Sequence, residues 1–125
     1  FKVKGYRKLG GRSPENSVGW YRKRFNPELV KGCRYTLEFE GIFRDAQVWM
    51  NGIYLGRGES GYVPLVFDVT ECLNYEPEAE NVISVRVDAT HSELWSYEGA
   101  GIYRNVWLTS TAPVHITQWG TFVTR

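Results

Sequence analysis

Residues 46–56 read Ala-Gln-Val-Trp-Met-Asn-Gly-Ile-Tyr-Leu-Gly. The Asn51-Gly52 dipeptide stands between two runs of β-prone residues, and both of its members tolerate positive φ angles. Such a dipeptide between two apolar runs is the strongest short-range signal for a β-hairpin with a two-residue turn. The sequence therefore predicts two antiparallel strands, 46–50 and 53–56, joined at this dipeptide.

The segments around this hairpin repeat with a period of two. Apolar and polar side chains alternate through residues 35–40 and 83–88, which is typical of strands with one buried face. Further strands are predicted at Val18–Phe25, Val63–Asp68, Ile102–Ser110 and Val114–Val123. Many short strands separated by turns indicate an all-β sandwich or barrel.

One short helical turn and two cysteines complete the local predictions. Residues 68–73 can form a single helical turn, with Asp68 or Thr70 as its cap. Cys33 and Cys72 are too few for a disulfide framework or a zinc site of the usual spacing. Two free thiols are favoured over a single bridge between them.

Size, composition and charge exclude several classes of protein. The chain has 125 residues, of which 42% are hydrophobic, enough for one domain with its own core and against disorder. The net charge is +1, and the charges of residues 21–24 would divide between two strand faces, so no nucleic-acid partner is expected. The sequence contains no run of about 18 apolar residues, so no membrane span is predicted. His91 and His115 lack metal-ligand spacing, so we expect no metal or cofactor.

Residues 95–108 combine bulky aromatics with a Gly-Ala-Gly stretch: Trp-Ser-Tyr-Glu-Gly-Ala-Gly-Ile-Tyr-Arg-Asn-Val-Trp-Leu. Aromatic faces suit the CH-rich faces of sugar rings, so Trp95 and Tyr97 are candidate sugar contacts. The alternative is that both side chains pack at the end of the sandwich or against another domain. The remaining tryptophans fall in predicted strands and are interpreted as core or interface residues unless exposed: Trp20, Trp49, Trp107 and Trp119.

A series of blocks, each weak by itself, occurs in a specific order along the chain. They include Gly-Trp-Tyr-Arg at 19–22, Ala-Gln-Val-Trp-Met-Asn-Gly at 46–52, Asn-Val-Ile-Ser-Val at 81–85 and Gly-Ile-Tyr-Arg at 101–104. In order and spacing they resemble the N-terminal sugar-binding domain of glycoside hydrolase family 2, the β-galactosidase and β-glucuronidase family. The resemblance implies a jelly-roll β-sandwich of the galactose-binding-domain-like type. It would span 1–125 as a single domain, with 1–14 as an irregular N-terminal segment.

The same resemblance implies an accessory role. In the family this domain precedes an immunoglobulin-like sandwich and a TIM barrel, and the barrel carries the two glutamates of a retaining glycosidase. Neither is present in this sequence, so the chain is expected to be a non-catalytic piece cut from a longer glycosidase, expected to be a β-galactosidase. Its implied partners are those two domains and a β-glycoside, bound weakly in isolation. A periplasmic or secreted location is favoured over a cytoplasmic one.

Two polar residues match positions through which this domain reaches the family's sugar pocket. Asn16 matches an asparagine before the first strand, and Glu93 matches an acidic residue before the loop tryptophan, although the family type has aspartate there. An amide and a carboxylate can both pair with sugar hydroxyls. Alternatively, Asn16 caps a turn after Pro14, and Glu93 is a solvated loop residue. Glu98 has no partner carboxylate at a defined spacing and is not expected to be catalytic.

Two points remain: the pairing of Arg104, and the two alternative functions of the chain. An unpaired buried guanidinium is costly, so Arg104 is expected to pair with Asp68 or Asp88 rather than with a ligand. A freestanding carbohydrate-binding module would need exposed aromatics and polar groups in one groove of this chain. A purely structural adaptor would tolerate substitution of Asn16 or Glu93.

Overall fold

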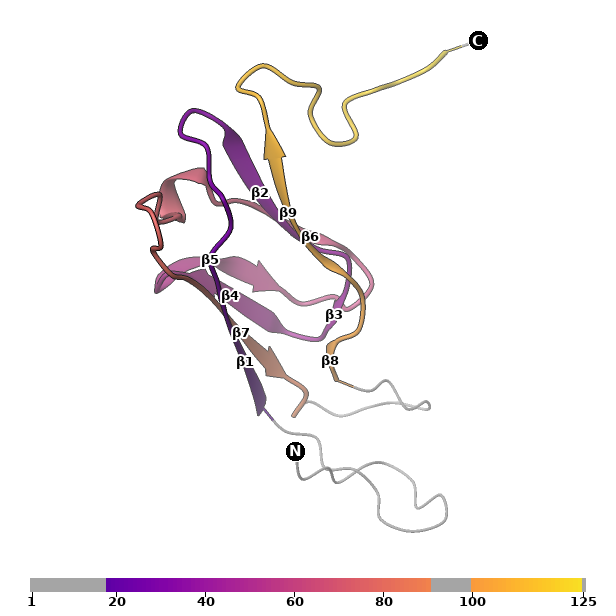
Figure 1. Ribbon diagram of the computed structural model, residues 1–125. Coiled ribbons are helices and arrows are strands. Elements are labelled where there is room, and N and C mark those ends of the chain that lie inside the picture. The colour runs from indigo at the N-terminus through magenta and orange to yellow at the C-terminus, as the bar shows by residue number, and fades with distance from the viewer. Residues whose placement is uncertain (1–17, 91–99, 125) are drawn as a thin grey trace.

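The computed structural model describes residues 18–90 and 100–124, which form two antiparallel sheets packed as layers (Figure 1). The four-stranded sheet has the order β1 (Val18–Phe25), β7 (Asn81–Asp88), β4 (Ala46–Met50) and β5 (Ile53–Gly58). The three-stranded sheet has the order β6 (Leu65–Asp68), β2 (Arg34–Phe39) and β9 (Val106–Thr111). Two short strands, β3 (Ile42–Phe43) and β8 (Gly101–Ile102), pair at one side. The predicted all-β, jelly-roll sandwich is confirmed.

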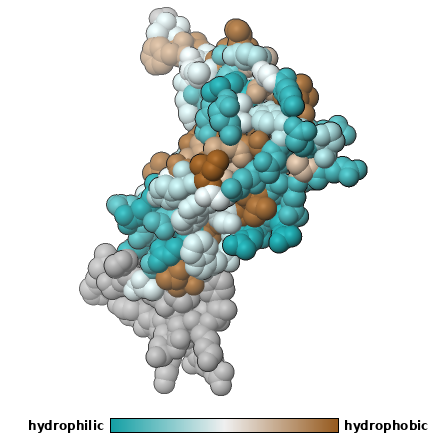
Figure 2. Space-filling view, turned by 90° about the vertical axis from the view of Figure 1, so that its left-hand side faces the viewer, coloured by the Kyte–Doolittle hydropathy of each residue, from teal (hydrophilic) through white to brown (hydrophobic). Residues whose placement is uncertain are grey.

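The core lies between the two sheets, where the period-two pattern directs every second side chain. Leu37 and Phe39 of β2 face Val48 and Met50 of β4 and Val85 of β7, and each is at most 1% exposed. Each such burial contributes about 1.5–3 kcal/mol. On the face drawn in Figure 2, hydrophobic residues form separate patches among hydrophilic ones.

The predicted hairpin is confirmed. Asn51 and Gly52 have φ angles of 49° and 84°, as a two-residue primed turn requires, and Met50 pairs with Ile53 across it. The Asn51 side chain also holds the neighbouring strand: its Oδ1 accepts a hydrogen bond of 2.8 Å from the Val82 amide. Its Nδ2 donates to the Cys72 carbonyl at 2.7 Å and to Asn81 Oδ1 at 2.8 Å.

Two of the predicted strands differ in the structure. The predicted strand 102–110 is divided, because β8 pairs with β3 in one small sheet while β9 pairs with β2 in another. Between them, the Tyr103 hydroxyl donates a 2.7 Å hydrogen bond to the Gly61 carbonyl. The predicted strand at Val114–Val123 is wrong, since the described residues 113–124 contain no strand. β-Prone residues form a strand only where a neighbouring strand can pair with them.

The predicted helical turn is present as a 3₁₀ helix, η1 (Thr70–Cys72), but its cap differs. Val69 occupies the cap position and makes no side-chain capping bond. The Asp68 carboxylate instead accepts hydrogen bonds from the Thr70 amide and hydroxyl, at 3.0 and 2.6 Å. Asp68 stands one residue too early to be the cap, so it forms a local Asx turn. Cys33 and Cys72 are both free, as predicted.

Candidate functional site

The four side chains predicted to contact sugar all lie outside the described residues: Asn16, Glu93, Trp95 and Tyr97. The structure does describe the residues that flank the two segments carrying them, 1–17 and 91–99. The geometry of these flanking residues is therefore what bears on the predicted site.

The flanking residues gather at one end of the sandwich. Val18, the first residue of β1, pairs with Asp88, the last residue of β7. Gly101, at the start of β8, has a φ of 121°, and a Cβ built on it would lie 2.4 Å from the Tyr21 hydroxyl of β1. The Tyr21 side chain of β1 thus reaches the backbone of β8, where the positive φ of Gly101 is one that glycine adopts readily. The start of β1, the end of β7 and the start of β8 lie at the same end of the molecule, at the bottom of Figure 1.

Asp88 fixes the path of the chain as it leaves β7. Its carboxylate accepts hydrogen bonds from the Thr90 hydroxyl at 2.5 Å, the Thr90 amide at 3.0 Å and Arg86 Nη2 at 2.7 Å. The Thr90 hydrogen bonds and then Arg86 lower the pKa of Asp88 from 3.8 to about 2. The Asp88 side chain is only 14% exposed, so solvent screens these interactions little.

These contacts predict an acid-dependent loss of stability. The pKa of Asp88 is lower in the folded chain than in the unfolded one. The contribution of Asp88 to the free energy of unfolding is therefore complete above about pH 4 and decreases as the pH falls toward about 2. We expect this contribution to be about 2 kcal/mol. Urea unfolding of the wild type and Asp88→Asn, compared between neutral and acid pH, measures it. The gap between the two proteins should narrow as the pH falls; a gap independent of pH would contradict the assignment.

The predicted pairing of Arg104 is wrong. Asp68 pairs with Arg34, and Asp88 pairs with Arg86. Arg104 is exposed, so its guanidinium requires no buried counterion, and it lies 5.3 Å from the ring centroid of Tyr103 in a cation–π contact.

A row of aromatic side chains crosses the outer face of the four-stranded sheet. Trp20 of β1 stacks on Trp49 of β4 with 5.4 Å between ring centroids, and Trp49 contacts Tyr54 of β5 at the same separation. Trp20 is 61% exposed and Tyr54 is 51% exposed. Sequence reasoning assigned Trp20 to a core or interface unless exposed, and the structure places it at the surface. The signal was available, because Trp20 alternates in phase with the charged residues Arg22 and Arg24.

The described residues offer no site for a metal ion. Within 18–90 and 100–124, no group of three or more His, Cys, Asp or Glu side chains is close enough to hold one. A separate finding concerns membrane spans: within the described residues 18–90 and 100–124, no helix is long and apolar enough to cross a bilayer.

Comparison with known proteins identifies the family. The model of the glycosyl hydrolase 2 galactose-binding domain-like family matches residues 13–112. The chain is 41% identical to a β-galactosidase of Bacteroides ovatus, covering 92% of this chain and 14% of that one. It is 37% identical to a β-glucuronidase of Formosa agariphila, covering 78% of this chain and 11% of that one.

Solved structures agree with this result. A glycosyl hydrolase family 2 member from Bacteroides cellulosilyticus superposes with a TM-score of 0.82 and 36% identity, covering 90% of this chain and 15% of that one. A β-glucuronidase of the same family has a TM-score of 0.77 at 33% identity, covering 87% and 13%. The chain spans a small part of these larger proteins. It belongs to the galactose-binding-domain-like domains of glycoside hydrolase family 2.

Proposed function

We propose that this chain is the non-catalytic sugar-binding domain of a larger family 2 β-glycosidase and completes the sugar subsite of that enzyme. The observation that carries the proposal is the meeting of β1, β7 and β8 at one end of the sandwich. Both segments with candidate sugar contacts attach there. The barrel would supply the two carboxylates that cleave the glycosidic bond.

In this proposal each candidate residue has a separate role. The Asn16 amide and the Glu93 carboxylate hydrogen-bond sugar hydroxyls, and Trp95 and Tyr97 line the rim with apolar surface. The partner domains are an immunoglobulin-like sandwich and a TIM barrel of the same protein. A β-galactoside is the proposed substrate, in line with the β-galactosidase among the relatives.

Substitution in the full-length enzyme tests the subsite role. We expect Asn16→Ala and Glu93→Gln each to lower kcat/KM by about tenfold or more, equivalent to about 1.4 kcal/mol of transition-state binding. The matched controls are Asn26→Ala and Glu28→Gln, which change exposed residues beyond the opposite end of β1. The controls should leave kcat/KM unchanged. If both test variants stay within about twofold of wild type, the domain is a structural adaptor instead.

Titration of neutral sugars into the chain separates this role from that of a freestanding module. Most polar contacts to the sugar would come from the barrel, so galactose and lactose should bind more weakly than about 0.1 mM, or about −5.5 kcal/mol. Isothermal titration calorimetry measures this. Tighter binding of either sugar would favour a freestanding carbohydrate-binding module.

A further inference from the structure

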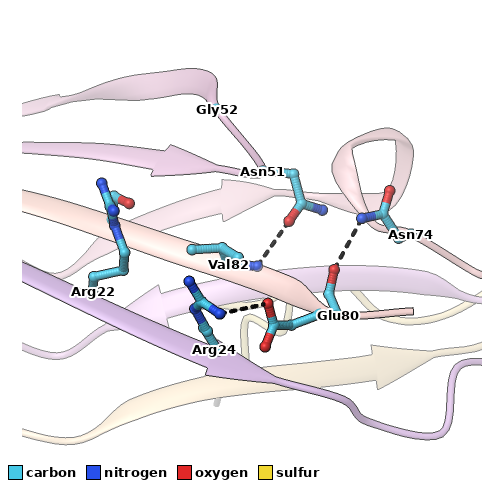
Figure 3. A pocket seen from close by; sticks show the side chains of 8 residues that line it. Arg22, Arg24, Asn51, Gly52, Asn74, Glu80 and Val82 are labelled. Carbon is cyan, nitrogen blue, oxygen red and sulfur yellow. Dashed lines mark hydrogen bonds and ion pairs between the residues drawn. The ribbon is translucent and has the colours of Figure 1, made fainter. Parts of the chain in front are cut away.

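A groove of about 420 Å³ lies on the outer face of the four-stranded sheet, away from the end that carries the two candidate segments. Arg22 and Arg24 of β1 extend over β7 near Val82, toward the turn at Asn51-Gly52 (Figure 3), and Ser84 of β7 also lines the groove. The volume is in the range of small-molecule sites in proteins.

The charges of the groove favour an anionic ligand. Arg24 Nη1 lies 3.4 Å from Glu80 Oε2, so the Glu80 carboxylate forms an ion pair with the Arg24 guanidinium. Within residues 18–90 and 100–124, Arg22 has no ion pair or hydrogen bond through its side chain. The guanidinium is planar and matches a carboxylate with two parallel hydrogen bonds. Arg22 therefore offers a place for a carboxylate from outside the chain.

The aromatic row borders the same groove. Arg22 pairs with Ser84 on β7, and Ser84 pairs in turn with Trp49 on β4. Trp20 precedes Arg22 by two residues, so the two side chains share a face and lie about 7 Å apart along the strand. An exposed indole can pack against the CH-rich face of a pyranose ring. Neighbouring rings of one oligosaccharide can therefore contact Trp20 and Arg22 together.

We propose that this face binds an oligosaccharide containing uronic acids, with a sugar carboxylate on Arg22 and a pyranose ring against Trp20. Charge complementarity selects this occupant over an apolar protein surface, because the groove carries two guanidiniums against the single carboxylate of Glu80. The site lies on the sheet face, so binding there neither requires nor tests Asn16 or Glu93.

Two matched tetrasaccharides test the proposal on the 125-residue chain. A β-1,4-linked glucuronic acid tetramer and cellotetraose differ only in the oxidation of C6, so calorimetry with both isolates the contribution of the carboxylates. We expect the acidic tetramer to bind about tenfold more tightly or better. Arg22→Gln should remove this preference, and Trp20→Ala should weaken both ligands.

Two further variants sharpen the test. Glu80→Gln should tighten binding of the acidic tetramer alone, because it removes the competing carboxylate from Arg24. Trp107→Ala is the matched control, since Trp107 is similarly exposed but lies on β9 of the other sheet. This control should bind both tetramers as the wild type does.

Three results of the binding experiments would overturn the proposal. They are absence of binding, equal binding of both tetramers, and unchanged binding by Arg22→Gln and Trp20→Ala. Sedimentation that shows the wild-type chain pairing through this face would also overturn it. Should a variant fail to fold, amide chemical shifts of the wild type decide: the acidic tetramer must perturb residues 20–24 and 82–84, and perturbation confined to Val18 and Gly101 contradicts the site.

Discussion

Truncation of Phe39 to alanine will lower the free energy of unfolding by about 3–5 kcal/mol. Phe39 is only 1% exposed and lies on the central strand of the three-stranded sheet, paired with Leu65 on one side and Val106 on the other. Neighbours held by hydrogen bonds on both sides cannot collapse into the space that the ring leaves. The cavity therefore adds to the lost burial of the ring itself.

Urea unfolding of the wild type and Phe39→Ala measures this loss at equal pH and temperature. Phe122→Ala is the control, since Phe122 is 87% exposed and should change stability by no more than about 0.5 kcal/mol. A loss below about 1 kcal/mol for Phe39→Ala would show that β2 does not lie at the centre of the core.

Replacement of Asn81 by leucine will cost about 3 kcal/mol, although both side chains branch at Cγ. Asn81 is fully buried, and its Oδ1 accepts hydrogen bonds of 2.8 Å from Asn51 Nδ2 and from the Asn74 amide. Its Nδ2 donates to the Asn74 carbonyl at 3.2 Å. Leucine removes these three hydrogen bonds, each worth about 0.5–1.5 kcal/mol.

The same urea titration, with Asn26→Leu as the control, tests the role of Asn81. Asn26 is exposed after β1, so the control should remain close to the wild type. Hydrogen exchange adds a local measure, because the Asn74 amide should lose its protection in Asn81→Leu. Stability equal to that of the wild type would contradict the assigned network.

The strands that the sequence predicted well are those whose pattern is local. β1 has the predicted bounds Val18–Phe25, and β7 contains the whole predicted alternation 83–88. The turn at Asn51-Gly52 needs only the φ preferences of its own two residues. The hydrogen bonds of the Asn51 side chain to Cys72, Asn81 and Val82 could not be predicted, because they join residues 21 to 31 positions apart in the sequence.

The two incorrect strand predictions depend on pairing between distant parts of the chain. Val114–Val123 has strong β propensity, yet Val114 is 93% exposed and no strand pairs with the described residues of this stretch. The division of 102–110 depends on which sheet each half joins, and alternation carries no information about that choice. For the candidate site, the positions of Asn16 and Glu93 stay a prediction. The exposure of Trp20 could have been predicted, because Trp20 alternates in phase with the charged residues Arg22 and Arg24.

The pairing of the first strand with the seventh has a consequence for how the chain acquires its shape during synthesis. Among the described residues, β1 forms its ladder with β7 alone, and Val18 pairs with Asp88. A ribosome must therefore release most of the domain before the opening strand can dock. Such distant closure slows folding and leaves an unpaired edge exposed in the meantime. The cationic stretch Arg22-Lys23-Arg24 lies on that waiting strand, and like charges there discourage two nascent chains from pairing with each other.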